Sequence, residues 1–91
     1  MNSSRNILFT PQAFEDFMSW VNENKKLFFK ISELIEETRR NPFEGKGKPE
    51  PLKHEYRGMW SRRITDEHRM VYKVTDTSIE FYSFRDHYGD K

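Results

Sequence analysis

The stretch RRNPFEGKGKPEPLKHEYRGMWSRRITDEHRMVY, residues 39–72, decides how this chain folds. It starts at a predicted helix end, crosses a segment rich in glycine and proline, and enters a predicted β-hairpin. Nine of its residues are Lys or Arg and five are Asp or Glu, whereas the whole chain has sixteen against fifteen. The positive charge is therefore concentrated here, which is typical of a surface that handles RNA.

The composition bounds the class of protein. Ninety-one residues predict a single domain, 1–91, and the 15% of aromatic residues can supply a core despite an apolar content of only 34%. The absence of cysteine excludes disulfides, thiolate catalysis and Cys-based zinc sites. Residues 1–5 are polar, and the apolar run at residues 7–9 is too short for a signal peptide or a membrane span. We expect a cytoplasmic protein.

Two antiparallel helices are predicted upstream of the opening stretch. After a short strand at residues 7–9, Thr10 supplies an N-cap hydroxyl and Pro11 the first helical position. Residues 22–24 interrupt this helix and cap a second one, which ends before Asn41 and Pro42. Apolar spacings of three and four define one face of each helix. These are Phe14, Phe17, Met18 and Val21 in the first, and Leu27, Ile31, Leu34, Ile35 and Thr38 in the second.

Residues 43–55 show neither helical nor strand periodicity and are predicted to form a long loop, which in so small a domain is more often functional than idle. Downstream, residues 58–65, 68–75 and 78–85 alternate like the strands of an antiparallel meander. The predicted fold class is α+β: an N-terminal strand, two antiparallel helices and a three-stranded meander, with the helices on one sheet face.

The alternation also predicts which strand residues face the helices. Trp60 and Ile64 join this face only if an odd connection or a bulge opposes Ile64 to Met70. The same shift puts Arg63 and Arg69 together on the other face. The remaining core-facing residues are Met70, Tyr72, Val74, Ile79 and Phe81, and the outward-facing ones are Val71, Lys73, Tyr82 and Phe84. Arg62 falls on the core side, for which an edge position or snorkelling is the only explanation that the pattern offers.

A glutamate and an arginine in this pattern, with a histidine near the C-terminus, suit chemistry at a phosphate. Glu50 lies between Pro49 and Pro51, which restrict the backbone and can aim its carboxylate. Arg69 can hold a phosphate with its planar guanidinium. Taken singly, each side chain is also explained without chemistry, Glu50 by pairing with a neighbouring lysine and Arg69 by pairing with Asp66 or Glu67.

Near the C-terminus, His87 is a candidate proton donor near neutral pH, and Tyr88 follows it. From the sequence alone, a histidine in a frayed C-terminus is the commoner explanation of this residue. His54 and His68 are weaker candidates, predicted to lie in a loop and a turn. The three histidines lack the spacing of known metal-binding motifs, so we expect no metal and no cofactor.

Taken together, these residues resemble the YoeB (Txe) toxins of the RelE superfamily. The resemblance covers nearly the whole chain. It is most specific in ELIEETRRNPFEGKGKPEPLKH (residues 33–54), in WSRRITDEHRMVY (residues 60–72) and in the pair His87 and Tyr88.

This resemblance implies a microbial-ribonuclease-like fold and a ribosome-dependent endoribonuclease that cuts mRNA in the A site. It implies a partner antitoxin of the YefM type, with homodimer formation also known in the family. It places the general base on Glu50, the phosphate-stabilising arginine on Arg69 and the general acid on His87. Supporting, RNA-binding roles fall on Lys53, Arg63 and Tyr88.

Two other functions are compatible with the same residues. The chain could be a non-catalytic RNA- or ribosome-binding module that inhibits translation without cutting, or an interaction protein that engages an antitoxin to regulate transcription. A carboxylate positioned toward RNA favours the nuclease, because binding alone gains nothing from a negative charge facing a phosphate.

Overall fold

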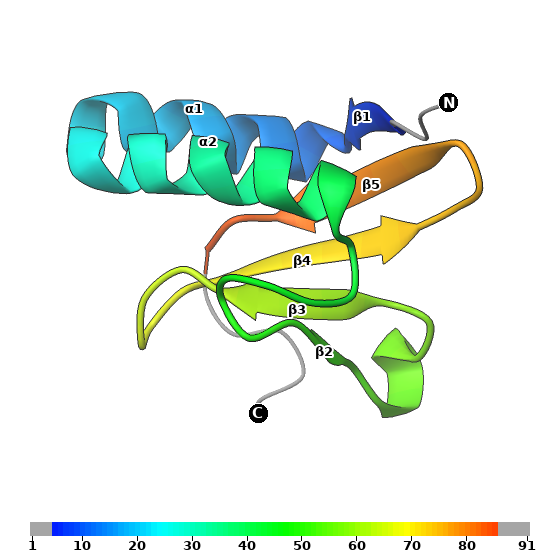
Figure 1. Ribbon diagram of the computed structural model, residues 1–91. Coiled ribbons are helices and arrows are strands. Elements are labelled where there is room, and N and C mark those ends of the chain that lie inside the picture. Colours follow the sequence, from blue (N-terminus) through cyan, green and yellow to red (C-terminus); the bar gives the residue numbers. More distant parts are fainter. Residues whose placement is uncertain (1–4, 86–91) are drawn as a thin grey trace.

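The computed structural model describes residues 5–85, which form a five-stranded mixed sheet with two helices on one face (Figure 1). The predicted α+β architecture is confirmed. The elements in chain order are β1 (Asn6–Phe9), α1 (Pro11–Glu23), α2 (Lys25–Arg40), β2 (Glu50–Pro51), the 3₁₀ turn η1 (His54–Tyr56), β3 (Trp60–Arg63), β4 (Arg69–Val74) and β5 (Ser78–Ser83). No helix in this range is both long and apolar enough to cross a membrane.

Both helices begin at the capping residues that the sequence predicts. The Thr10 hydroxyl accepts a hydrogen bond from the Ala13 amide at 3.1 Å, with Pro11 at the first helical position. The Asn24 side chain accepts from the Leu27 amide at 3.1 Å and starts α2. Each bond satisfies one of the amides that a helix start leaves unpaired.

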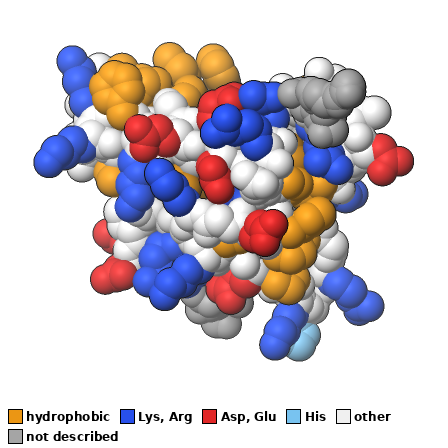
Figure 2. Space-filling model, viewed as in Figure 1, with side chains coloured by type: hydrophobic (Ala, Val, Ile, Leu, Met, Phe, Trp, Pro, Cys, Tyr) orange, Lys and Arg blue, Asp and Glu red, His pale blue; other side chains and the backbone are white. Residues whose placement is uncertain are grey.

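The buried face of α1 differs from the predicted apolar face. Phe14 and Met18 are 56% and 46% exposed, whereas Ala13 and Trp20 are buried. The third residue that α1 buries is Asp16. Because Asp16 is acidic, hydrophobicity alone does not identify the face of α1 that packs on the core. Figure 2 shows the resulting apolar side chains on the outer side of the helices.

The strand order is β1-β5-β4-β3-β2. β3, β4 and β5 form the predicted antiparallel meander, while β1 lies parallel to β5 at one edge. Phe9 of β1 contacts the rings of Phe17, Phe81 and Phe84 edge-on, with centroids 5.4–5.7 Å apart. At the other edge, β2 lies within the segment predicted to be a loop, and η1 begins inside that segment and ends one residue beyond it. Two-residue β2 is too short for any periodicity to reveal it.

The β3–β4 hairpin has the odd connection that the face assignment requires. Three residues lie between Ile64 and His68, whose carbonyl accepts from the Ile64 amide at 2.9 Å. Arg63 and Arg69 lie on the same face, as predicted, and face each other in register, whereas Met70 faces Arg62 and not Ile64 as predicted. The predicted faces of the β3 and β4 residues are therefore correct, whereas the predicted partner of each residue is wrong by two positions.

A bulge in β5 reverses the predicted orientation of Phe84. Val71 pairs with Ser83 and Tyr72 pairs with Phe81, so Tyr82 is the extra residue. This insertion turns Phe84 into the core, where it is fully buried. Beyond the bulge, side chains of α1 replace the strand pairing: the Asp16 carboxylate accepts from the Phe84 amide at 2.9 Å, and the Trp20 indole donates to the Phe84 carbonyl at 3.1 Å.

Arg62 is fully buried on the helix side of the sheet and is neither an edge residue nor a snorkelling one. Its guanidinium donates to the carbonyls of Asn41, Glu44 and Lys46 and to the Tyr72 hydroxyl. That hydroxyl donates in turn to the Pro42 carbonyl at 2.7 Å. In Figure 1 the chain leaving α2 crosses β4 and β3 on this face before it reaches β2. Arg62 thereby fastens the crossing segment to the sheet.

Gly47 closes this attachment. Its carbonyl accepts a hydrogen bond from the Arg63 amide at 2.7 Å. Its φ of +82° is a backbone conformation that residues with a side chain rarely adopt. A Cβ added there would lie 3.1 Å from both the Arg62 Cβ and the Arg63 carbonyl oxygen. Glycine at this position lets the crossing segment lie directly on β3.

Replacing Arg62 with methionine should lower the free energy of unfolding by at least about 3 kcal/mol, because hydrogen bonds from a charged group contribute about 1.5–3 kcal/mol each. Urea denaturation measures this loss. The matched control is Arg63→Met one residue away, whose exposed side chain should cost less than about 1 kcal/mol. Equal losses for the two variants would contradict the anchoring role of Arg62.

Tyr72→Phe should show a pH-dependent defect. Burial raises the pKa of Tyr72, against the opposing effect of the Arg62 guanidinium. The stabilisation from the neutral phenol is therefore present below about pH 10, the ordinary tyrosine pKa, and is lost as pH rises through the higher folded-state value. The variant should be about 1–3 kcal/mol less stable at neutral pH, where its partners are left unpaired. In urea titrations that deficit should shrink above about pH 10; a constant deficit would disprove the assignment.

Candidate active site

The candidate site lies on the face of the sheet opposite the helices, where β2, β3 and β4 run side by side. Glu50 occupies the first position of β2 and pairs in register with Ser61 of β3. Prolines flank it on both sides, which an edge strand tolerates because its outer amides have no strand to bond. Its side chain is 60% exposed. The carboxylate is thus held on a restricted backbone and open to an incoming molecule.

Arg69 lies at the start of β4 and reaches across β3 to Glu50. Its Nη1 is 3.3 Å from the Glu50 Oε2, and its side chain is only 17% exposed. From the sequence, the non-catalytic explanations were a salt bridge from Arg69 to Asp66 or Glu67 and one from Glu50 to a nearby lysine. The structure instead pairs Arg69 with Glu50. A single contact at this distance, with one exposed partner, contributes about 0–1 kcal/mol and is easily exchanged.

Of the supporting residues, the structure brings Arg63 to the site but shows no such contact for Lys53. Arg63 faces Arg69 across the β3–β4 pairing, and its guanidinium lies 3.9 Å from the Asp66 carboxylate. Lys53 is exposed just after β2, where it precedes η1. Among residues 5–85, no hydrogen bond or ion pair joins Lys53 to Glu50 or Arg69.

Three buried polar atoms on this face have no hydrogen-bond partner within the described part of the chain: the Ser61 and Ser83 hydroxyls and the Arg69 Nε. Ser61 and Ser83 flank Val71 in one row across the sheet, and Glu50 continues that row. Unpaired buried polar atoms are uncommon in folded proteins and often mark functional positions. Neither serine is among the site residues predicted from the sequence. Alternation could have found Ser61, but the bulge hides the orientation of Ser83.

Two of the site residues predicted from the sequence, His87 and Tyr88, lie outside the described residues. The last described residue, Arg85, stacks 3.9 Å above the Trp20 ring and lies 2.5 Å from the Glu23 carboxylate. The strand that leads toward the two candidates is therefore fixed on α1.

The aromatic residues predicted on this face divide into two cases. Phe84 does not reach this surface, because the bulge turns it into the core, where it is fully buried. Tyr82 remains partly exposed, and its hydroxyl donates to the Glu80 carboxylate at 3.3 Å. Burial, reinforced by Glu80, raises the pKa of Tyr82.

The arrangement joins a carboxylate that can accept a proton to a guanidinium that can stabilise negative charge. An anionic substrate would compete with Glu50 for Arg69, because a phosphate offers oxygens that suit the guanidinium fork. Once released from Arg69, Glu50 would be free to act as a base beside the bound anion. This pairing suits acid–base chemistry on a phosphodiester.

Comparisons with known proteins agree over nearly the whole chain. The family model described as "YoeB-like toxin of bacterial type II toxin-antitoxin system" matches residues 9–88. Toxin YoeB of Escherichia coli strain K12 is 52% identical over 82 residues, which is 90% of this chain and 98% of the relative.

Solved structures show the same relationship. The YoeB dimer from Staphylococcus aureus superposes with a TM-score of 0.86 at 48% identity, covering 93% of this chain and 99% of that one. A chain of the YoeB–YefM complex from Staphylococcus aureus gives a TM-score of 0.83 at 49% identity, covering 92% of this chain and 98% of that one. Fold, sequence and family model converge, and the chain belongs to the YoeB-like toxins of bacterial type II toxin–antitoxin systems.

Proposed function

We propose that this toxin is a ribosome-dependent endoribonuclease that cleaves mRNA in the ribosomal A site and thereby inhibits translation in the cytoplasm. The observation that carries the proposal is the contact between Glu50 and Arg69, at 3.3 Å on an open sheet edge. Neither residue is required by the core. In a transesterification at phosphorus, a carboxylate can act as the base and a guanidinium can stabilise the developing negative charge.

In the proposed mechanism the RNA supplies its own nucleophile. Glu50 takes the proton of the 2′-hydroxyl, and the oxygen attacks the adjacent phosphorus. His87 protonates the departing 5′-oxygen, so the products are a 2′,3′-cyclic phosphate and a 5′-hydroxyl. Arg69 stabilises the charge that develops on the phosphoryl oxygens, supported by Arg63 and Lys53. Tyr88 has a supporting role in binding the RNA.

Arg69 is suited to this role by its position. Its side chain is largely enclosed, so its charge acts in surroundings of lower dielectric than water. Among the described residues, its buried Nε has no partner, and its Nη1 makes the weak contact with Glu50. An incoming phosphodiester could therefore take over the guanidinium without breaking a strong bond. The same exchange frees the Glu50 carboxylate to accept the proton.

The proposed partners follow from the relatives. The YoeB–YefM complex from Staphylococcus aureus suggests that a YefM-type antitoxin binds and inhibits this chain. Its covering segment should be acidic, to match the arginines of the site, and should fold as it binds. The YoeB dimer from the same organism suggests homodimer formation. Ribosomal RNA and mRNA would meet the sheet face that carries Arg63 and Arg69.

Glu50→Ala, Arg69→Ala and His87→Gln should each lower cleavage by about 100-fold or more, the usual loss when a positioned acid, base or charge donor is removed. Primer extension on mRNA from a translation extract measures the cuts. Circular dichroism should show an intact fold, since the Glu50–Arg69 contact contributes little stability.

Glu55→Ala is the matched control for Glu50→Ala, because it removes an exposed carboxylate of the same charge from the adjacent η1 turn. It should cleave like the unaltered protein. Full activity in the Glu50 variant would rule out its role as base. Arrest of translation with intact mRNA would instead favour the non-catalytic RNA- or ribosome-binding function.

A further inference from the structure

Strand β3 separates the two members of the candidate site, and Ser61 is its residue opposite Glu50. Ser61 pairs in register with Glu50 of β2 on one side and with Val71 of β4 on the other. Residues that face each other in an antiparallel pair project to the same face of the sheet, with Cβ atoms about 4.5–5.5 Å apart. The Ser61 hydroxyl therefore belongs to the side chain of β3 that lies directly beside that of Glu50.

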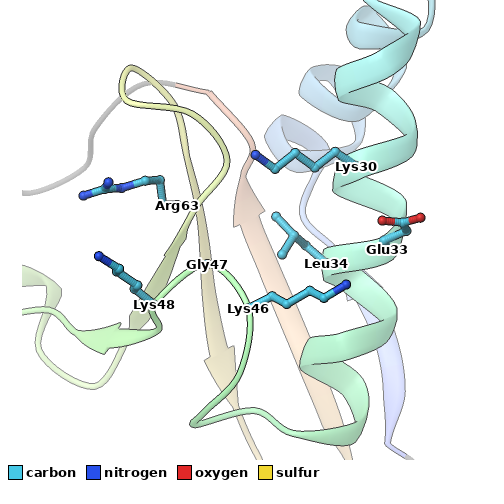
Figure 3. A pocket seen from close by; sticks show the side chains of 7 residues that line it. All are labelled: Lys30, Glu33, Leu34, Lys46, Gly47, Lys48 and Arg63. Atoms are coloured by element: carbon cyan, nitrogen blue, oxygen red, sulfur yellow. The ribbon is translucent and has the colours of Figure 1, made fainter.

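The neighbours of Ser61 in β3 show which face its side chain occupies. Arg62, the next residue, is buried on the helix side of the sheet. Arg63, two residues along the strand, shares the face of Ser61 by alternation. Figure 3 shows the Arg63 side chain extending away from α2. Ser61 thus lies on the face opposite the helices, together with the contact between Glu50 and Arg69.

The Ser61 hydroxyl is buried and has no hydrogen-bond partner within residues 5–85, and the whole residue is only 1% exposed. The Arg69 Nε on the same face is also unpaired in this range, so neither atom satisfies the other. A buried hydroxyl without a partner is unfavourable, because it has lost its hydrogen bonds to water and gained none in return. The fold of this part of the chain therefore gains nothing from the hydroxyl.

The contact between Arg69 and Glu50 explains why the hydroxyl is unused. Arg69 pairs with Arg63, and Glu50 pairs with Ser61, so the Arg69 side chain crosses β3 beside Ser61 to place its Nη1 3.3 Å from the Glu50 Oε2. While this contact lasts, the guanidinium supplies the carboxylate with a charged donor. When a phosphate takes the guanidinium, the carboxylate loses this donor, and the hydroxyl opposite it can replace it.

We infer that Ser61 is a positioning residue for the proposed base: once substrate has taken Arg69, its hydroxyl donates to the Glu50 carboxylate and holds it toward the 2′-hydroxyl of the RNA. The inference rests on the proposed nuclease function. The hydroxyl needs only to rotate, and its single donated bond leaves other lone pairs of the carboxylate free to accept the proton. Without it, a side chain that is 60% exposed turns freely into solvent.

The new bond also favours the exchange itself. In the free toxin the Ser61 hydroxyl is unpaired within the described part of the chain, and in the substrate complex it gains a charged acceptor. The unfavourable burial of the hydroxyl is thereby relieved only when Arg69 moves from Glu50 to the phosphate. Ser61 thus contributes to the reacting state and not to the resting one, as an efficient catalytic interaction requires.

The test is a double-mutant cycle on ribosome-bound mRNA, in which single-turnover cleavage is followed by primer extension at several toxin concentrations. Ser61→Ala should lower the maximal rate about 10-fold, the loss expected for one hydrogen bond to a charged group. The toxin concentration that gives half the maximal rate should change less than about 2-fold, because Ser61 does not touch the RNA.

In the Glu50→Ala background, Ser61→Ala should lower the rate less than about 2-fold further, because residues that act as a unit are not additive. Independent action would instead multiply the two losses to about 1,000-fold, and that result would overturn the inference.

Two other replacements separate the hydroxyl of Ser61 from the space that it fills. Ser61→Cys fills this space with a weak donor and should stay slow. Ser61→Thr restores the hydroxyl in a residue that strands favour and should recover most of the rate. A fast cysteine variant would contradict the role of the hydroxyl.

Urea denaturation provides a readout of stability that is separate from the rate. Ser61→Ala should be at least as stable as the unaltered protein, because it removes an unpaired buried group. A loss of stability in proportion to the loss of rate would make Ser61 a structural residue and overturn the inference.

Ser83→Ala is the matched control. Ser83 is also 1% exposed, and its hydroxyl is likewise unpaired among the described residues. It lies two strands farther along the same row, which at the usual strand spacing is about 14 Å from Glu50. Its effect on the rate should be the same with and without the Glu50→Ala change. Coupling to Glu50 as strong as that of Ser61 would overturn the inference, because the effect would then not depend on lying opposite Glu50.

The readouts separate this inference from the proposed function. If Glu50→Ala loses cleavage while Ser61→Ala keeps it, the proposed base stands and the role of Ser61 fails. If Glu50→Ala keeps full cleavage, or the unaltered toxin cuts no mRNA on ribosomes, the proposed function fails and the role of Ser61 fails with it.

Discussion

The structure depends on a charged side chain enclosed where an apolar one would be expected. Arg62 is fully buried and donates to three carbonyls of the segment that crosses from α2 to β2, and to the Tyr72 hydroxyl. Those carbonyls belong to an irregular segment and have no strand or helix to bond them. The guanidinium is the one side chain with enough donors in a fixed plane to satisfy several at once. Removing it would leave both a loose segment and unpaired polar groups.

This anchor links the core to the candidate site. The crossing segment ends in β2, so the bonds on one face of β3 determine where Glu50 lies on the other. Arg62 and Arg63 are neighbours in one strand with opposite orientations: the first holds the segment from inside, and the second faces Arg69 outside. Alternation within a strand thus couples a structural arginine to a functional surface. The strained pair Gly47 and Lys48 lies at the junction.

The bulge at Tyr82 determines how the end of β5 attaches to α1. It turns Phe84 inward to join Phe9 and Phe17, and it leaves a backbone amide and carbonyl that α1 must satisfy. Asp16 does so at the amide, which explains a buried carboxylate in the apolar face of α1. The result is a firm attachment of the strand end to the helix. That attachment sets the starting point of the chain that continues toward His87.

The elements with local causes could be predicted from the order of the amino acids alone. Capping by Thr10 and Asn24, the helix end at Asn41, the meander, and the placement of Arg63 beside Arg69 all follow from propensity and alternation. The sequence also marked Glu50 and Arg69, through flanking prolines, strand parity and family resemblance. Long-range packing, by contrast, sets the role of Arg62, the inward turn of Phe84, the short strand β2, and the direct contact between Glu50 and Arg69. These features depend on hydrogen bonds between residues distant in the chain, and no local pattern encodes such a pairing.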